Sequence, residues 1–190
     1  MKSYKLLLLP LLLTLFIGGC GGIKPTVFLH QDYNFAFVER VAVVPFEDLS
    51  SDQGASSRAT RLFIGQLLSM NAFDVVEPGE VSKAMMKLSI SKAAELSVEN
   101  ATALGAELGV QAIFLGSVNE TATIRSGNSS SNVVTITVRL VETERGVTVW
   151  SASNTSGGKG FVKTLFGAGE KSKAEVMRNC IKEITKTLID

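Results

Sequence analysis

Few residues in this sequence have side chains suited to catalysis or metal binding. Its 190 residues include two cysteines, Cys20 and Cys180, and a single histidine, His30. A Ser-His-Asp or Cys-His arrangement would have to use His30, which stands among aromatic residues, where packing or surface exposure is the commoner role. A zinc site needs several histidine or cysteine ligands, and the chain offers too few. We therefore predict no enzyme, no metal site and no bound cofactor.

Two other groups of residues have side chains that could bind ligands. Glu47, Asp48 and Asp52 are close in sequence, but their spacing is not that of a calcium-binding EF-hand, so we expect a solvated loop. Residues 157–160 (GGKG) contain a lysine within glycines, as phosphate loops do. That lysine is followed by glycine and not by serine or threonine, so a flexible connection is the preferred interpretation.

Cys20 has the most informative surroundings. Two lysines precede an apolar stretch over residues 6–17, and two glycines stand directly before the cysteine. This order of basic, apolar and small residues is typical of a secretory signal. The apolar stretch is shorter than the about 20 residues of an ordinary membrane-spanning helix. We predict a signal peptide over residues 1–19 whose end is marked by a functional Cys20. The alternative is an ordinary signal peptide that a cysteine follows by chance.

Residues 17–20 (IGGC) resemble the lipobox of bacterial lipoproteins. The resemblance implies a covalent diacylglycerol on the sulfur of Cys20 and an acyl chain on its new amino group. A thiolate is the nucleophile that such a modification requires. By the same resemblance, glycine in place of aspartate at position 21 favours the outer membrane, with the protein facing the periplasm.

Charge and composition limit the partners of the remaining chain. Without the two lysines of the signal, 17 basic residues face 18 acidic ones, a net charge of −1. No basic excess remains to hold phosphates, so nucleic-acid binding is disfavoured. We divide the chain into a lipidated tether and lead-in over residues 20–38 and one domain over residues 39–190. The lead-in is too apolar for a free linker, so part of it is expected to pack onto the domain.

The first half of the domain reads as alternating strands and helices. Residues 41–46 form a continuous apolar run, typical of a strand buried on both faces in a parallel sheet. A helix is predicted over about 55–70 and a short strand over 73–76. Apolar residues at helical spacing then predict two helices, one beginning near Pro78 and one ended by Gly109.

The second half changes to a period of two. We predict a strand over residues 110–124, a polar turn over 125–132 and a half-buried strand with Val134, Ile136, Val138 and Leu140 on one face. A turn at 144–146 leads to a strand over 147–154, and a final helix covers about 172–188. The order is β-α-β-α-α-β-β-β-α, which predicts an α/β fold with a mixed sheet sandwiched by helices.

Four residues of this second half invite an interpretation beyond packing. Trp150 is expected in the core, with an exposed anchor for a partner as the alternative. Cys180 lies beside the apolar stripe of the last helix and is expected to be a small core residue, with an intermolecular disulfide as the alternative. Leu165 and Phe166 interrupt a glycine-rich loop over residues 157–169, so they form a possible interaction loop.

Several core segments resemble a known family of envelope proteins. Residues 40–48 (RVAVVPFED), 73–81 (FDVVEPGEV), 112–118 (AIFLGSV) and 138–153 (VRLVETERGVTVWSAS) are similar to the domain of the curli assembly and transport component CsgG. Lipoprotein activators of penicillin-binding proteins and the amino-terminal domain of the Tol translocation protein share this pattern. The resemblance covers most of residues 38–189 and implies the fold, without catalytic residues.

One departure from the curli channel matters for function. That channel forms its pore with two long hairpins, whose places are taken here by residues 125–132 and 155–171. A membrane-spanning strand needs about 9–11 residues, so these segments favour no pore. We expect a non-enzymatic accessory or scaffolding lipoprotein that binds another envelope protein or itself. The alternative is a ring-forming subunit of an outer-membrane secretion or assembly complex without its own barrel, and an enzyme with a carboxylate site is disfavoured.

Overall fold

The computed structural model describes residues 24–126, 129–157 and 171–188. Seven strands form one mixed sheet in the order β1-β7-β6-β5-β2-β4, with β3 pairing beside β5. The strands are β1 (Thr26–Leu29), β2 (Arg40–Val43), β3 (Glu47–Asp48), β4 (Asp74–Val75), β5 (Ala112–Ser126), β6 (Ser129–Glu142) and β7 (Thr148–Gly157). The helices are α2 (Ala55–Met70), α3 (Pro78–Lys87), α4 (Val98–Leu108) and α6 (Lys173–Lys186), with short 3₁₀ turns η1 (Phe35–Phe37) and η2 (Ala93–Glu95).

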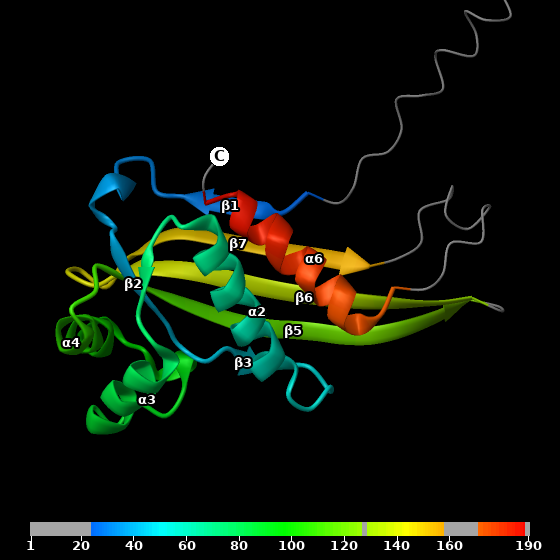
Figure 1. Cartoon of the computed structure of the whole chain (residues 1–190), viewed down its shortest axis with the longest axis horizontal. Helices are drawn as coiled ribbons and strands as arrows, with labels where there is room; N and C mark the ends of the chain where they lie inside the picture. The colour runs from blue at the N-terminus through cyan, green and yellow to red at the C-terminus, as the bar shows by residue number, and fades with distance from the viewer. Residues whose placement is uncertain (1–23, 127–128, 158–170, 189–190) are drawn as a thin grey trace, which may run out of the picture.

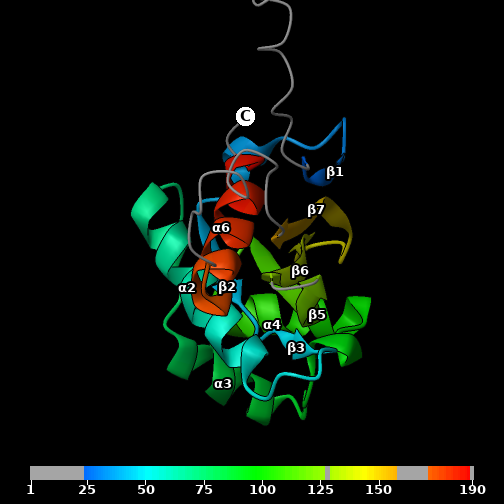
Figure 2. The ribbon, with the colours of Figure 1, turned by 90° about the vertical axis from the view of Figure 1, so that its right-hand side faces the viewer.

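Helices cover both faces of the sheet, as the predicted α/β fold requires (Figures 1 and 2). On one face, α2 and α6 pack over the sheet through residues such as Phe63, Leu67 and Ile181. On the other face, α3 and α4 cover a smaller area through Val81 and Leu104. The predicted order of helices and strands is confirmed, and the structure adds β1 and β3 to it.

Strand β2 lies between two parallel neighbours, and its faces are buried because helices cover both sides of the sheet. Val41 pairs with Val75 of β4 on one side and with Ala112 of β5 on the other. Val41 and Val43 belong to the core beneath α2, whereas Ala42 belongs to the core beneath α3 and α4. The continuous apolar run is thus explained by a strand without a solvent-facing side.

The meander β5-β6-β7 has an apolar face toward α6, and its other face is apolar only where α3 and α4 cover it, at Ile113, Leu115 and Val141. Val134, Ile136, Val138 and Leu140 are fully buried on the side of α6, as the alternation predicts. The predicted turn over residues 125–132 is wrong, because β5 and β6 remain paired to Arg125↔Ser130 and Ser126↔Ser129. The apolar alternation stops there, but a backbone ladder needs no apolar side chains.

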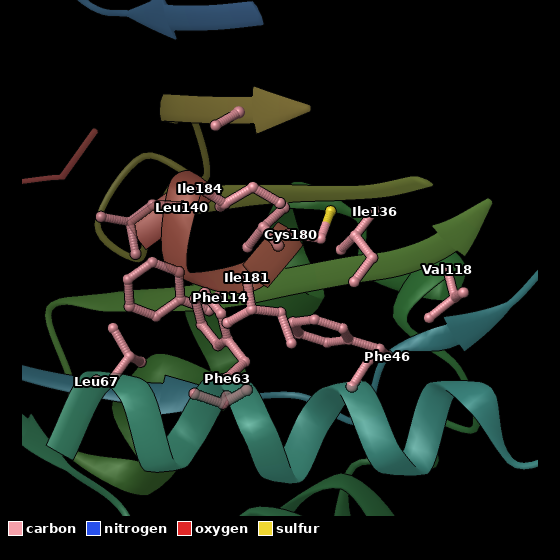
Figure 3. Close-up of a cluster of buried hydrophobic side chains, with 14 of the residues drawn as sticks. Phe46, Phe63, Leu67, Phe114, Val118, Ile136, Leu140, Cys180, Ile181 and Ile184 are labelled. Carbon is pink, nitrogen blue, oxygen red and sulfur yellow. The ribbon is translucent and has the colours of Figure 1, made fainter. Parts of the chain in front are cut away.

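Large aromatic side chains join the main core of the fold (Figure 3). Phe63 of α2 lies between Phe46 and Phe114, with ring centroids 5.3 and 5.1 Å apart, and Phe114 also meets Trp150 at 6.2 Å. A Cβ atom at Gly116 would lie only 2.6 Å from the ring of Phe46. Glycine at this position therefore allows the Phe46 ring to lie flat against β5.

Candidate functional site

Cys180 is a core residue, as expected from its place on the last helix. Its side chain is fully buried, and its thiol donates a hydrogen bond to the backbone oxygen of Asn154 at 3.2 Å. Burial raises the pKa of the Cys180 thiol to about 11. A thiol with so little thiolate, enclosed by apolar side chains, is neither a nucleophile nor a ready disulfide partner.

His30 does not take part in a catalytic arrangement in the described part of the chain. Its backbone N–H donates to the oxygen of Val149 at 2.9 Å, which continues the pairing of β1 with β7. Its Nδ1 atom is buried and has no hydrogen-bond partner among the described residues. No described group therefore orients the imidazole through this nitrogen, as the partner of a general base would.

The three acidic residues of the segment after β2 are each engaged separately, and Glu47 and Asp48 form strand β3 where the sequence suggested a loop. Glu47 accepts a hydrogen bond from the N–H of Ala94 at 2.7 Å, and Asp52 forms an ion pair with Arg58 at 2.9 Å. The carboxylate of Asp48 accepts from the hydroxyl of Ser50 at 2.7 Å, and this bond lowers the pKa of Asp48. Within residues 24–126, 129–157 and 171–188, no three metal-ligating side chains come together.

Trp150 also belongs to the core, so its alternative role as an exposed anchor is wrong. The ring is fully buried, and its Nε1–H donates to the hydroxyl of Thr187 at 3.3 Å. Sequence alternation places Val149 on the opposite face from Trp150, yet both side chains are buried in the same core. An irregularity between Leu140 and Val141, which pair with Trp150 and Thr148, explains the difference.

Several predicted residues lie outside the described part of the chain. Cys20, Leu165 and Phe166 are among them, as are residues 158–160 of the GGKG segment. The lipid attachment and the interaction loop therefore stay predictions. Among the described residues, no helix combines the length and the apolar character needed to cross a membrane.

The described residues form an open groove with a volume of about 910 Å³. It lies where α2 and α6 end, beside the edge strand β4. Its apolar lining comes from separate segments of the chain: Phe35, Ala36, Val38, Leu68, Ala72, Phe73, Val75 and Leu188. Leu68 is 57% exposed, and nearby Phe37 is 71% exposed.

Local sequence explains the shape of this groove. Asn71 ends α2 in the left-handed conformation at φ 51°, and its N–H donates to the oxygen of Leu68. This end turns the chain directly into Phe73 and β4. On the other side, the carboxamide of Asn34 accepts from the N–H of Ala36 and holds η1 over the groove.

The rim of the groove is acidic. Glu39 and Glu77 line it together with Asp74, whose carboxylate pairs with Arg40 at 3.2 Å. This groove was not predicted from the sequence, because its lining residues are far apart in the chain. One indication of it in the sequence is the lead-in over residues 20–38, which contains more apolar residues than a linker that packs against nothing requires.

Comparison with known proteins identifies the fold. No family model and no curated protein sequence matches the chain. A variant of the PelC dodecamer from Paraburkholderia phytofirmans aligns with a TM-score of 0.59 and 17% identity over 87% of this chain and 98% of that one. Lipoprotein GNA1162 from Neisseria meningitidis aligns with a TM-score of 0.58 and 18% identity over 80% and 98%.

A third structure belongs to one of the groups that the sequence resembles. The LpoB C-terminal domain from Salmonella enterica aligns with a TM-score of 0.48 and 16% identity over 62% of this chain and 82% of that one. This last similarity is too low to support a functional argument. The similarities to CsgG and to the Tol translocation protein remain expectations from sequence.

Proposed function

We propose that this protein is a non-enzymatic accessory lipoprotein of the bacterial envelope that acts by binding another protein. The observation that carries the proposal is the open groove at the ends of α2 and α6, which combines exposed apolar side chains with an acidic rim. A lipoprotein, GNA1162, has a similar fold and supports the class. With lipid on Cys20, the domain would be held at the outer membrane and face the periplasm.

The groove has the chemistry of a site for a protein segment. Covering the exposed groove residue Leu68, and Phe37 next to the groove, with a partner is favourable by about 25 cal/mol per Å² of apolar area. The carboxylates of Glu39 and Glu77 on the rim favour a partner with basic residues beside its apolar ones.

Crosslinking in living cells tests this proposal. A photo-reactive amino acid at position 68 of the full-length protein should form a discrete adduct with one envelope protein. Position 86 is the matched control, because Met86 is 72% exposed but lies on α3, away from the groove. The additional change Glu77→Lys should weaken the adduct at position 68, since it reverses a rim charge. Equal labelling from both positions, or no specific partner and no oligomer, would refute the proposal.

A ring-forming subunit of an envelope assembly is the second candidate. The observation that favours it is the fold similarity to PelC, which was solved as a dodecamer. Light scattering coupled to size-exclusion chromatography, with the lipidated protein in detergent, separates the candidates. A closed ring of defined mass supports the second candidate, and a monomer or dimer supports the first.

A further inference from the structure

Strand β1 forms an edge of the sheet that nothing in the described structure covers (Figure 1). Its consecutive apolar residues Val27, Phe28 and Leu29 are 44%, 50% and 54% exposed. Edge strands are usually protected from other chains by charged residues, prolines or bulges. Lys24 and Pro25 precede the strand, but Thr26–Leu29 contains none of these devices. The edge is therefore open to another strand.

The pairing with β7 determines which backbone groups of β1 remain free. The N–H of His30 points to β7, where it donates to Val149. In an antiparallel ladder, alternate residues direct both N–H and C=O to the same neighbour. Phe28 therefore bonds to β7, where it lies opposite Ser151, while the N–H and C=O groups of Val27 and Leu29 point outward.

We propose that β1 pairs with β1 of a second copy of this chain, antiparallel, across a two-fold axis at Phe28. In this register, Val27 lies opposite Leu29 of the partner subunit, and each such pair exchanges both of its backbone hydrogen bonds. Phe28 lies opposite the partner's Phe28, at the closer spacing of a pair without hydrogen bonds. The outward backbone groups of both strands are then paired, so the edge is self-complementary.

The same register covers the exposed apolar side chains. Val27 and Leu29 pair with Ala152 and Trp150, so they lie on the face of the sheet that α2 and α6 cover. Phe28 lies on the opposite face, where its partner in the ladder is Ser151. A strand of the same sequence places apolar side chains against apolar ones on both faces.

Two properties of the chain favour a second copy over a different partner. The apolar triplet is arranged symmetrically about Phe28, and the strand has no charge that would select a different strand. The predicted anchor at Cys20 lies six residues before Thr26, a reach of about 20 Å. The strand is about 13 Å long, which is shorter than the reach of each tether, so the anchors of both copies reach the same membrane. Anchoring in one membrane concentrates the copies.

Disulfide trapping of the full-length protein in membranes tests the register. With Phe28→Cys, the two Cα atoms would lie about 4.5 Å apart, within the disulfide range, so mild oxidation should give a covalent dimer. Thr26→Cys is the matched control on the same face of the same strand. In this register, the two residues at position 26 lie about 14 Å apart and should not crosslink. Cys180 is buried and stays silent, and the unchanged chain reports any background from Cys20.

A second variant keeps the fold and removes only the outward contact. Val27→Pro deletes an N–H that points away from β7, so it should leave the domain folded and abolish the dimer in light scattering. No dimer from Phe28→Cys, equal dimers from both cysteine variants, or an adduct with a different protein would each overturn the proposal. Protection of the thiol introduced at position 28 from a water-soluble reagent, without any disulfide, would also overturn it and indicate a lipid contact. Labelling from position 68 tests the groove separately.

Discussion

Trp150 and Cys180 show how single polar atoms are accommodated in the core. The Trp150 indole N–H donates to Thr187, and the Cys180 thiol donates to the backbone of Asn154. Because both donors find an acceptor, burial carries no penalty for an unmade hydrogen bond. These contacts make both residues structural, which leaves Cys20 as the residue with the predicted chemical role.

The thiol of Cys180 should be unreactive in the native protein. With a pKa of about 11, roughly one thiol in a thousand is ionised at pH 8, and the side chain is enclosed. We expect no reaction with a disulfide reagent at pH 8 in buffer and complete reaction in denaturant. An unfolded thiol ionises near pH 9, so this group stabilises the fold less as the pH rises from 9 to 11. Rapid labelling of the native protein would contradict the burial of Cys180.

Replacement of the lipidated residue tests the predicted anchor. Cys20→Ser removes the only nucleophile that the modification uses, so labelling by a fatty-acid analogue should disappear. Cys180→Ser is the control and should keep its label. Persistent labelling of the Cys20→Ser protein would mean that the IGGC segment is not a lipobox.

At the scale of the elements, β5 and the segment after β2 approach each other closely because Gly116 has no side chain. Phe46 lies against the backbone of Gly116, and its ring meets Phe63 of α2. The same loop is tied to both covering helices, since Asp52 pairs with Arg58 of α2 and with Lys173 of α6. A tight backbone approach thus positions α2, whose end forms one wall of the groove.

Substitutions of two glycines separate this contact from general effects of glycine. Gly116→Ala places a Cβ within 2.6 Å of the buried Phe46 ring and should lower the free energy of unfolding by about 1–3 kcal/mol. Gly65→Ala is the control, because its Cβ would meet nothing within 4 Å on the exposed side of α2. It should raise the free energy of unfolding by about 0.5–1 kcal/mol. Denaturant unfolding curves measure both, and equal effects would show that the Phe46 contact is unimportant.

At the scale of the whole molecule, one sheet links both cores. Val43 and Phe114 belong to the core under α2 and α6, while their neighbours Ala42 and Ile113 belong to the core under α3 and α4. Because β2 and β5 contribute to both cores, a loss of packing in one core also exposes apolar side chains of the other core. We therefore expect the described part of the chain to unfold as a single cooperative unit.

Two spectroscopic probes can test this cooperativity. Trp150 reports on the core under α6, and far-ultraviolet circular dichroism reports on all helices, including α3 and α4. Their denaturation midpoints should coincide, since the cores share β2 and β5. A separate loss of circular dichroism before the change in Trp150 fluorescence would show that the α3–α4 side unfolds independently.

The sequence by itself determined the α/β class and the order of the principal elements. The spacing of apolar residues in α2 and the alternation through Val134 and Ile136 are local signals, and each appears unchanged in the structure. The lipobox is likewise a local signal, and its residues stay a prediction. Buried positions such as Trp150 follow from the same periodicity, because one face of each element must leave water.

Only the tertiary structure decided where the open surfaces lie. The edge position of β1 depends on pairing with β7, more than a hundred residues later, and a strand of four residues is too short to show a period of its own. The pairing of β5 with β6 continues past Arg125 through backbone hydrogen bonds between the strands. Such bonds do not depend on the types of the side chains, so the sequence pattern does not reveal them. The groove combines Phe35, Leu68 and Leu188 from distant segments, and only the packing of α2 and α6 on the sheet brings them together.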